Sequence, residues 1–399
     1  MAGKRILLAA EFLRGGATVA RLLPLAVALA DRGHDVTLAL PVELSDVIAG
    51  SGFPMLDAPR WKVPPPPGFV AVSYADLLMH GGWASTDALR GLMSGWQFLL
   101  EQTKPDMLIA DFAPTAMLVA RAAGIATAAV GDGFSLPPLI APLPNMRPWA
   151  DVALDAPASV EGRVLAVVNA RLGALHVPEL RRLRALFEGV SCFLCTFPEL
   201  DHYADRPDGI WYGEVFAPSR GPAAVWPTGT GERAYVDLDP RHPALGAIVE
   251  ALHRLGLPTL VQAAVMPARQ ADAIERGAIQ VTTTTNRASV LSGCDIVICQ
   301  GHEVAVLALL AGKPLLMLPV FVEQMMTLHR AAKLGVAHGV EPNADAAAID
   351  AAVRRLVDDR ACRLRAVNFG RTYDGYRPGF AIDAVADAID DSLNVEGSP

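Results

Sequence analysis

The feature that most constrains this chain is a repeated order of apolar stretch, helical pattern and second apolar stretch. At the start, residues 4–12 predict a strand, residues 19–32 predict a helix that stops at Gly33, and residues 35–40 predict the next strand. Parallel strands need a long crossover connection, usually a helix, and parallel sheets are covered on both faces. The opening therefore predicts an α/β domain with a parallel sheet.

The same order restarts in the second half of the chain, after a segment rich in Pro, Gly and Trp. This repetition predicts an α/β fold of two Rossmann-like domains facing across a cleft. The predicted divisions are an N-terminal domain at 1–203, a linker at 204–231, a C-terminal domain at 232–375, and a C-terminal helix at 376–399 that packs back towards the N-terminal domain.

Composition narrows the class of protein. The 399 residues are 52% apolar with a net charge of −8, and the 34 basic residues are scattered, so no nucleic-acid partner is expected. No secretory signal or membrane-spanning run is expected either, and we predict a cytoplasmic, reduced protein. Cys192 and Cys195 lie inside an apolar run without a second ligand pair, which predicts buried thiols and no metal site. The abundance of Ala, Gly and Pro is typical of a high-GC genome.

Polar residues follow two predicted strands of the second half. The strand at 294–299 leads into Gln300, Gly301, His302 and Glu303, and the strand at 315–319 is followed by Glu323 and Gln324. Ligands of open α/β sheets bind at the carboxyl ends of strands, and helix N-termini there favour anions. These residues are therefore the candidate donor site. The alternatives are a turn histidine that caps its helix and an ordinary helix start at the Glu-Gln pair.

Two strands of the first half end at acids, Asp111 and Asp132. Each is a candidate catalytic group, and each is equally well explained as a cap of the turn or helix that follows. The candidate acceptor-binding side chains are aromatic or imidazole groups in and after the Pro-rich loop, for which packing or simple solvation is the alternative: Trp61, His80, Trp83 and Phe134.

Five segments in the right order resemble the two-domain (GT-B) glycosyltransferases of the UDP-glycosyltransferase type. Residues 17–25 are similar to the family's Gly-His-V-x-R-x-x-P-L segment, and residues 32–37 to its R-G-H-x-V-T turn. The other three segments are the P-D-x-x-x-x-D strand at 105–111, the donor motif at 295–319 and the D/E-Q pair at 323–324. The resemblance implies a bacterial glycosyltransferase that uses a nucleoside-diphosphate sugar, UDP or TDP, without metal or covalent cofactor. It further implies a small-molecule acceptor, inversion at the anomeric carbon, and sugar hydroxyls bound by Glu323 and Gln324.

Two departures from the family pattern bear on chemistry. Thr18 stands where the family has its histidine base, and a threonine hydroxyl is not basic at neutral pH. Gln300 stands at the donor-phosphate histidine, so it can offer only a neutral hydrogen bond, while His302 is placed to supply an imidazole. Glu303 suits the helix dipole but repels a diphosphate. Asp111, with Asp132 close by, is the candidate replacement base, because neighbouring carboxylates raise one pKa.

Three functions remain open on the sequence alone. The leading one is sugar transfer to a small molecule by a monomer or homodimer. The absence of both family histidines favours a second, a non-catalytic binding or auxiliary protein. The third is another reaction on a nucleotide sugar, such as epimerisation.

Overall fold

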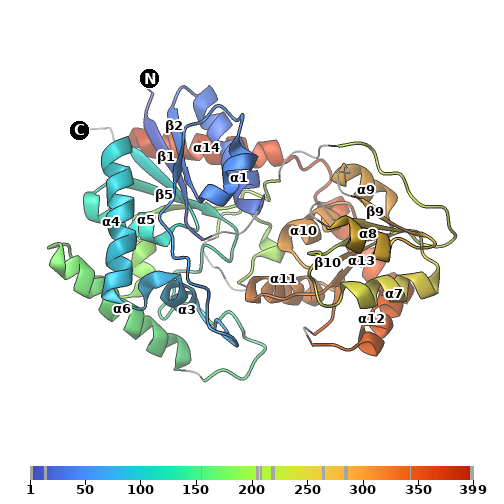
Figure 1. The fold of residues 1–399 in the computed structure, drawn as a ribbon. Coiled ribbons are helices and arrows are strands. Elements are labelled where there is room, and N and C mark those ends of the chain that lie inside the picture. Colours follow the sequence, from blue (N-terminus) through green and yellow to red (C-terminus); the bar gives the residue numbers. More distant parts are fainter. Residues whose placement is uncertain are drawn as a thin grey trace. The chain divides into compact units, whose positions relative to one another are not determined.

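The chain folds into two compact α/β units. In this computed structural model the described residues are 3–12, 16–153, 155–203, 206, 209–216, 221–262, 266–282, 286–341 and 343–395. One unit comprises Met1–Ala217 and Arg377–Pro399, and the other Pro218–Tyr376. Each unit contains a six-stranded sheet with helices on both faces (Figure 1). The predicted architecture of two Rossmann-like domains is confirmed. Residues 13–15 of the predicted glycine turn and parts of the predicted linker lie outside the described residues.

The N-terminal unit has a parallel sheet in the order β3-β2-β1-β4-β5-β6. Its strands are β1 (Arg5–Ala10), β2 (Asp35–Leu40), β3 (Met55–Asp57), β4 (Met107–Asp111), β5 (Ala126–Gly131) and β6 (Ser191–Leu194). Its helices are α1 (Gly16–Asp31), α2 (Ser45–Ile48), α3 (Tyr74–Leu78), α4 (Thr86–Thr103), α5 (Pro114–Ala123), α6 (Ala156–Ala174) and α14 (Pro378–Val395). The chain adds strands to one side of β1 and then to the other. The topological switch point, where such sheets bind ligands, therefore lies between β1 and β4.

The C-terminal unit repeats this topology with the order β12-β11-β10-β7-β8-β9, again parallel throughout. Its strands are β7 (Ala234–Asp237), β8 (Thr259–Gln262), β9 (Ile279–Thr282), β10 (Ile296–Cys299), β11 (Leu315–Met317) and β12 (Ala337–Gly339). Its helices are α7 (Leu245–Leu255), α8 (Ala268–Ile274), α9 (Arg287–Gly293), α10 (His302–Leu310), α11 (Val322–Lys333), α12 (Ala346–Asp358) and α13 (Arg360–Thr372). Its switch point lies between β7 and β10.

The sequence pattern of residues 73–103 predicts one helical stretch, but in the structure this stretch is interrupted. After α3 the chain forms one wide π-helical turn, Met79–Trp83, before α4 begins. Gly82 has a φ of 99°, and a Cβ on Gly81 would lie 2.1 Å from the Phe12 ring. The two glycines are therefore required, because Gly82 has a positive φ and Gly81 lies directly against Phe12, two residues after the end of β1.

The last helix belongs to the N-terminal unit. Helix α14 packs against α1, and Arg32 after α1 pairs with Asp387 at 2.6 Å. His34 contacts Asp390 at 2.6 Å, Nε2 to carboxylate oxygen. In the described part of the chain, no helix combines the length and apolarity that a bilayer crossing requires.

Candidate functional site

A buried carboxyl group stands at the switch point of the N-terminal sheet. Glu11 follows β1, is 2% exposed, and accepts hydrogen bonds from the backbone N–H of Thr115 at 2.8 Å and from its hydroxyl at 2.6 Å. The Thr115 hydroxyl in turn accepts from the indole N–H of Trp83 at 3.0 Å. Burial raises the pKa of Glu11 to about 8, against the lowering effect of both Thr115 contacts.

A buried cation lies beside the two predicted catalytic acids. Arg21 of α1 is 2% exposed and forms a two-pronged pair with Asp111 at 3.0 and 3.3 Å. Burial lowers the pKa of Arg21, but the charges of Asp111 and Asp132 more than offset this, so its pKa is raised. Asp132 also accepts from the backbone N–H of Ser135 at 3.1 Å. The structure thus brings the two acids around a shared guanidinium, and Thr18 is buried on the same helix.

An aromatic cluster lies at the same edge of the sheet. Phe112, directly after β4, has a φ of 50°, a conformation that costs energy in a non-glycine residue. Its ring lies 4.8 Å from Phe12, 5.8 Å from Tyr74 and 5.9 Å from Phe134. The backbone N–H of Phe12 donates to the Phe112 carbonyl at 3.1 Å, which ties the ends of β1 and β4 together.

The predicted acceptor-binding residues divide by exposure. Trp61 is 39% exposed, and the His80 ring is partly exposed and stacks on Phe69 with centroids 3.7 Å apart. Trp83 and Phe134 are buried, which favours the packing alternative for these two side chains. Of these two tryptophans, only Trp61 exposes its side chain to solvent.

The predicted donor residues gather at the start of α10 in the C-terminal unit. The side-chain oxygen of Gln300 accepts the backbone N–H of Asp239 at 3.1 Å. His302 is buried, and its Nδ1 lies 3.0 Å from the Thr327 hydroxyl. Gly301 is the N-cap of α10 and supplies no capping side chain. The turn after β10 is thus anchored on both sides, to the end of β7 and to α11.

An ion-pair network spans the switch point between β7 and β10. Arg287 opens α9 and pairs with Glu303 in the first turn of α10 at 2.8 Å, and lies 3.9 Å from Asp237 at the end of β7. The Tyr235 hydroxyl donates to Asp237 at 2.8 Å. Burial raises the pKa of Asp237, with Arg287 and Tyr235 opposing the change.

Glu323 and Gln324 lie in the first turn of α11. The side-chain oxygen of Gln324 accepts backbone N–H groups of Val320 at 2.8 Å and Phe321 at 3.3 Å, so Gln324 fixes the loop after β11. The Glu323 carbonyl accepts from the Thr327 hydroxyl at 3.2 Å. Thr327 therefore links Glu323 to His302, and the two predicted halves of the donor site are joined through one side chain.

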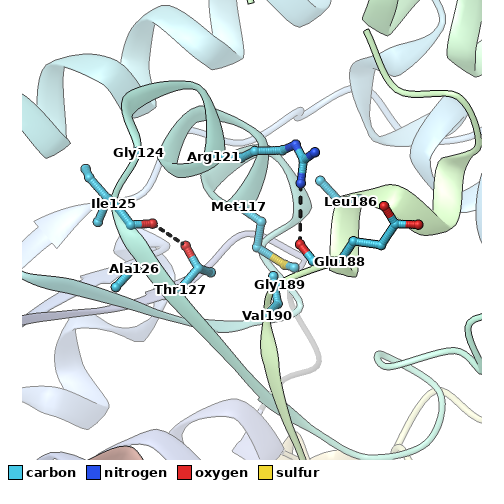
Figure 2. Close-up of a pocket in the computed structure, with 10 residues that line it drawn as sticks. All are labelled: Met117, Arg121, Gly124, Ile125, Ala126, Thr127, Leu186, Glu188, Gly189 and Val190. Carbon is cyan, nitrogen blue, oxygen red and sulfur yellow. Dashed lines mark hydrogen bonds between the residues drawn. The ribbon is translucent and has the colours of Figure 1, made fainter. Parts of the chain in front are cut away.

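Two further features lie away from these edges. A cavity of about 400 Å³ opens at the amino ends of β5 and β6, where Arg121 donates to the Glu188 carbonyl at 3.4 Å (Figure 2). In the C-terminal unit, His338, Asp359 and Cys362 hold ligand-type atoms within 4.8 Å of one another. Asp359 bonds His338 at 2.9 Å and caps the N–H of Cys362 at 2.9 Å, so a helix cap accounts for this cluster without an ion.

Solved structures match over almost the whole chain, although no family model and no curated protein matches it. The glycotransferase of kitacinnamycin aligns over 98% of this chain and 99% of its own, with a TM-score of 0.71 and 18% identity. The calicheamicin glycosyltransferase CalG4 aligns over 100% of both chains, with a TM-score of 0.70 and 19% identity. The chain has the GT-B fold. The glycosyltransferase SsfS6 of Streptomyces sp. SF2575, complexed with thymidine diphosphate, aligns over 96% of this chain and 99% of its own, with a TM-score of 0.63 and 19% identity.

Within the GT-B fold, four residues at the switch points were not singled out from the sequence: Glu11, Arg21, Phe112 and Arg287. A signal for Arg21 and Glu11 was present, because each is a charged residue inside or next to an apolar run and must find a buried partner. The sequence does not show which residues these partners are, since Asp111 lies 90 positions after Arg21 and Thr115 lies 104 positions after Glu11.

Proposed function

We propose that this protein transfers a sugar from a nucleoside-diphosphate sugar to a small-molecule acceptor, with inversion and without a metal ion. The observation that carries the proposal is the coincidence of the donor-type residues with the switch point of a GT-B domain. Because open α/β sheets bind ligands at this point, the same residues are supported by the sequence motif and by the topology.

The proposed donor site is the start of α10 together with the first turn of α11. Backbone N–H groups at the start of α10 point at the diphosphate, with Gln300, Gly301 and His302 around it. Glu323 and Gln324 hold the sugar hydroxyls. The thymidine diphosphate in the complex of SsfS6 supports a nucleoside diphosphate as leaving group, with TDP and UDP as the candidates.

The proposed acceptor site is the carboxyl edge of the N-terminal sheet, with Trp61 and His80 at its surface. Asp132 is the preferred proton acceptor, and Asp111 the second candidate, because Asp111 is held in its two-pronged pair with Arg21. Thr18 acts as a hydrogen-bonding group rather than as a base. The acceptor oxygen attacks the anomeric carbon as the bond to the diphosphate breaks, and the diphosphate leaves as an anion stabilised by the helix N-terminus.

The test is incubation of the purified protein with UDP-, TDP- and GDP-sugars and a panel of phenolic and alcoholic acceptors, followed by mass spectrometry. Transfer appears as acceptor mass plus one sugar, with release of the nucleoside diphosphate. We expect Asp132→Asn to reduce kcat by 10²-fold or more, as loss of a general base does. Full turnover by both Asp132→Asn and Asp111→Asn would exclude these acids as bases.

A non-catalytic binding protein is the second candidate, favoured by Thr18 and Gln300 at the two family histidines. It predicts thermal stabilisation by a nucleoside diphosphate without turnover, since a specific ligand stabilises the folded state. A changed sugar isomer without transfer would instead indicate an epimerase. The absence of stabilisation by any nucleotide would exclude both enzymatic functions and leave a non-catalytic protein that does not bind nucleotides.

A further inference from the structure

The candidate donor site lacks an obvious positive charge at the residues that the sequence motif identifies. A diphosphate is a multiply charged anion, and a neutral donor such as Gln300 forms a hydrogen bond roughly half as strong as a charged one. The Gln300 oxygen is turned to the Asp239 backbone, and His302 is buried against Thr327. Glu303, one residue further along α10, adds a negative charge at the same helix end.

Arg287 is placed to correct this balance. It opens α9, directly after Asn286, whose side chain caps the helix by accepting from the backbone N–H of Ser289. From there the guanidinium reaches Glu303 on one side of the switch point and approaches Asp237 on the other. Without Arg287, the carboxyl groups of Glu303 and Asp237 would stand at this edge without a nearby cation, so its charge offsets part of their repulsion of an anion.

The Arg287 side chain is held by an ion pair and is still accessible. It keeps 36% of its exposure, in contrast to the buried Arg21. A guanidinium has five N–H donors, and the pair with Glu303 uses only part of them. Holding the side chain beside the strand ends before a ligand arrives reduces the entropy lost on binding. Glu303 and Asp237 thus orient the guanidinium and leave part of its N–H groups available to a ligand.

We infer that Arg287 is the diphosphate-binding cation of the donor site, supplying the charge that Gln300 cannot. This rests on the proposed function, since it assigns a residue to the donor of that reaction. The competing explanation is an ion pair that only fastens α9 to α10. That explanation predicts a small loss of stability on substitution and no selective effect on phosphate-containing ligands.

The experiment compares dissociation constants for UDP and TDP with those for uridine and thymidine, measured by calorimetric competition on the full chain. Arg287→Gln is expected to weaken nucleoside-diphosphate binding about tenfold to a hundredfold, the range for a lost charged hydrogen bond. Nucleoside binding should be unchanged, and Arg287→Lys should lose less. The dependence of affinity on salt should become shallower in Arg287→Gln, because one charge contact is gone.

Arg254→Gln is the matched control, because Arg254 also pairs with a carboxylate, Asp350 at 2.7 Å. It lies in the last turn of α7, away from the start of α10. An equal loss for nucleosides and nucleoside diphosphates, or no loss for either, would overturn the inference while leaving the proposed function in place. If the wild-type protein binds neither UDP nor TDP, the proposed function fails and this inference fails with it. Glu303→Gln breaks the same ion pair and keeps the guanidinium, so it decides the question even if Arg287→Gln is poorly folded. The inference predicts that this variant retains or increases its affinity for nucleoside diphosphates, and a selective loss of that affinity would overturn it.

Discussion

The buried carboxyl group of Glu11 should make the stability of the N-terminal unit depend on pH. In the folded chain its pKa is about 8, against an ordinary value of 4.5. Between these values the folded protein keeps a proton on Glu11 that the unfolded chain has released. Stability rises with pH only where the unfolded state binds more protons, so here it falls as pH rises. The contribution is complete below about pH 4.5 and is lost by the time the pH passes about 8.

The magnitude follows from the same two values. Each pH unit across the window corresponds to about 1.4 kcal/mol, so the whole window amounts to roughly 5 kcal/mol. That is comparable with the entire free energy of unfolding of a marginally stable domain, about 5–15 kcal/mol. The effect is therefore large enough to measure.

The assay is urea unfolding of wild type and Glu11→Gln at four pH values between 5 and 8.5, with tryptophan fluorescence as the readout. Trp83 is a suitable probe because it donates to Thr115, the partner of Glu11. Glutamine reproduces the protonated acid and does not titrate. The wild type should therefore lose stability relative to the variant by up to about 1.4 kcal/mol per pH unit. Thr115→Val, which removes a contact that lowers the pKa of Glu11, should extend the loss to higher pH. Parallel profiles for wild type and Glu11→Gln would refute the reasoning.

The remaining predictions concern the two switch points. Asp111→Asn should destabilise the N-terminal unit by about 3–5 kcal/mol, because it leaves Arg21 buried without its charge partner, and the double variant Asp111→Leu with Arg21→Met should recover much of this in urea unfolding. Gln324→Ala should cost about 1 kcal/mol through loss of the acceptor that fixes the start of α11, seen as a lower melting temperature. Glu323→Ala should abolish transfer while the affinity for the bare nucleoside diphosphate, measured by calorimetry, stays within about twofold of wild type, since a factor of two is below 0.5 kcal/mol. A fall in nucleoside-diphosphate affinity as well would contradict a role confined to the sugar.

The order of strands and helices could be predicted from the sequence because it depends on local patterns. Apolar runs such as 35–40 and 107–110 became β2 and β4 almost residue for residue. The break in the 73–103 helix was less visible. The paired glycines indicate an irregular backbone at this point. The path of the turn, however, depends on the Phe12 ring, which lies directly against Gly81.

The candidate site divides along a similar line. The residues of the predicted donor motif lie within thirty positions of one another, so the sequence could predict them as one group, and the topology places the start of α10 at a switch point. The charge balance at both sites could not be predicted, because it comes from side chains that meet only after two strands are paired. In the sequence, Arg21 is one charged residue in a largely apolar segment, and nothing predicts a partner for Arg287. Their partners Asp111 and Asp237 lie on strands and come beside them only in the folded chain.

Helix α14 has a consequence for synthesis on the ribosome. Its 18 residues complete the N-terminal unit, yet they are translated after the whole of the other unit. Domains generally fold as units while the chain emerges, N-terminal first. Here the face of α1 that receives α14 must wait through the translation of more than a hundred intervening residues, as the unit bounds show. A stop codon shortly before Pro378 would leave the second unit intact and the first one uncovered. A C-terminal truncation should therefore destabilise the N-terminal unit, although most of that unit lies far from the cut in sequence.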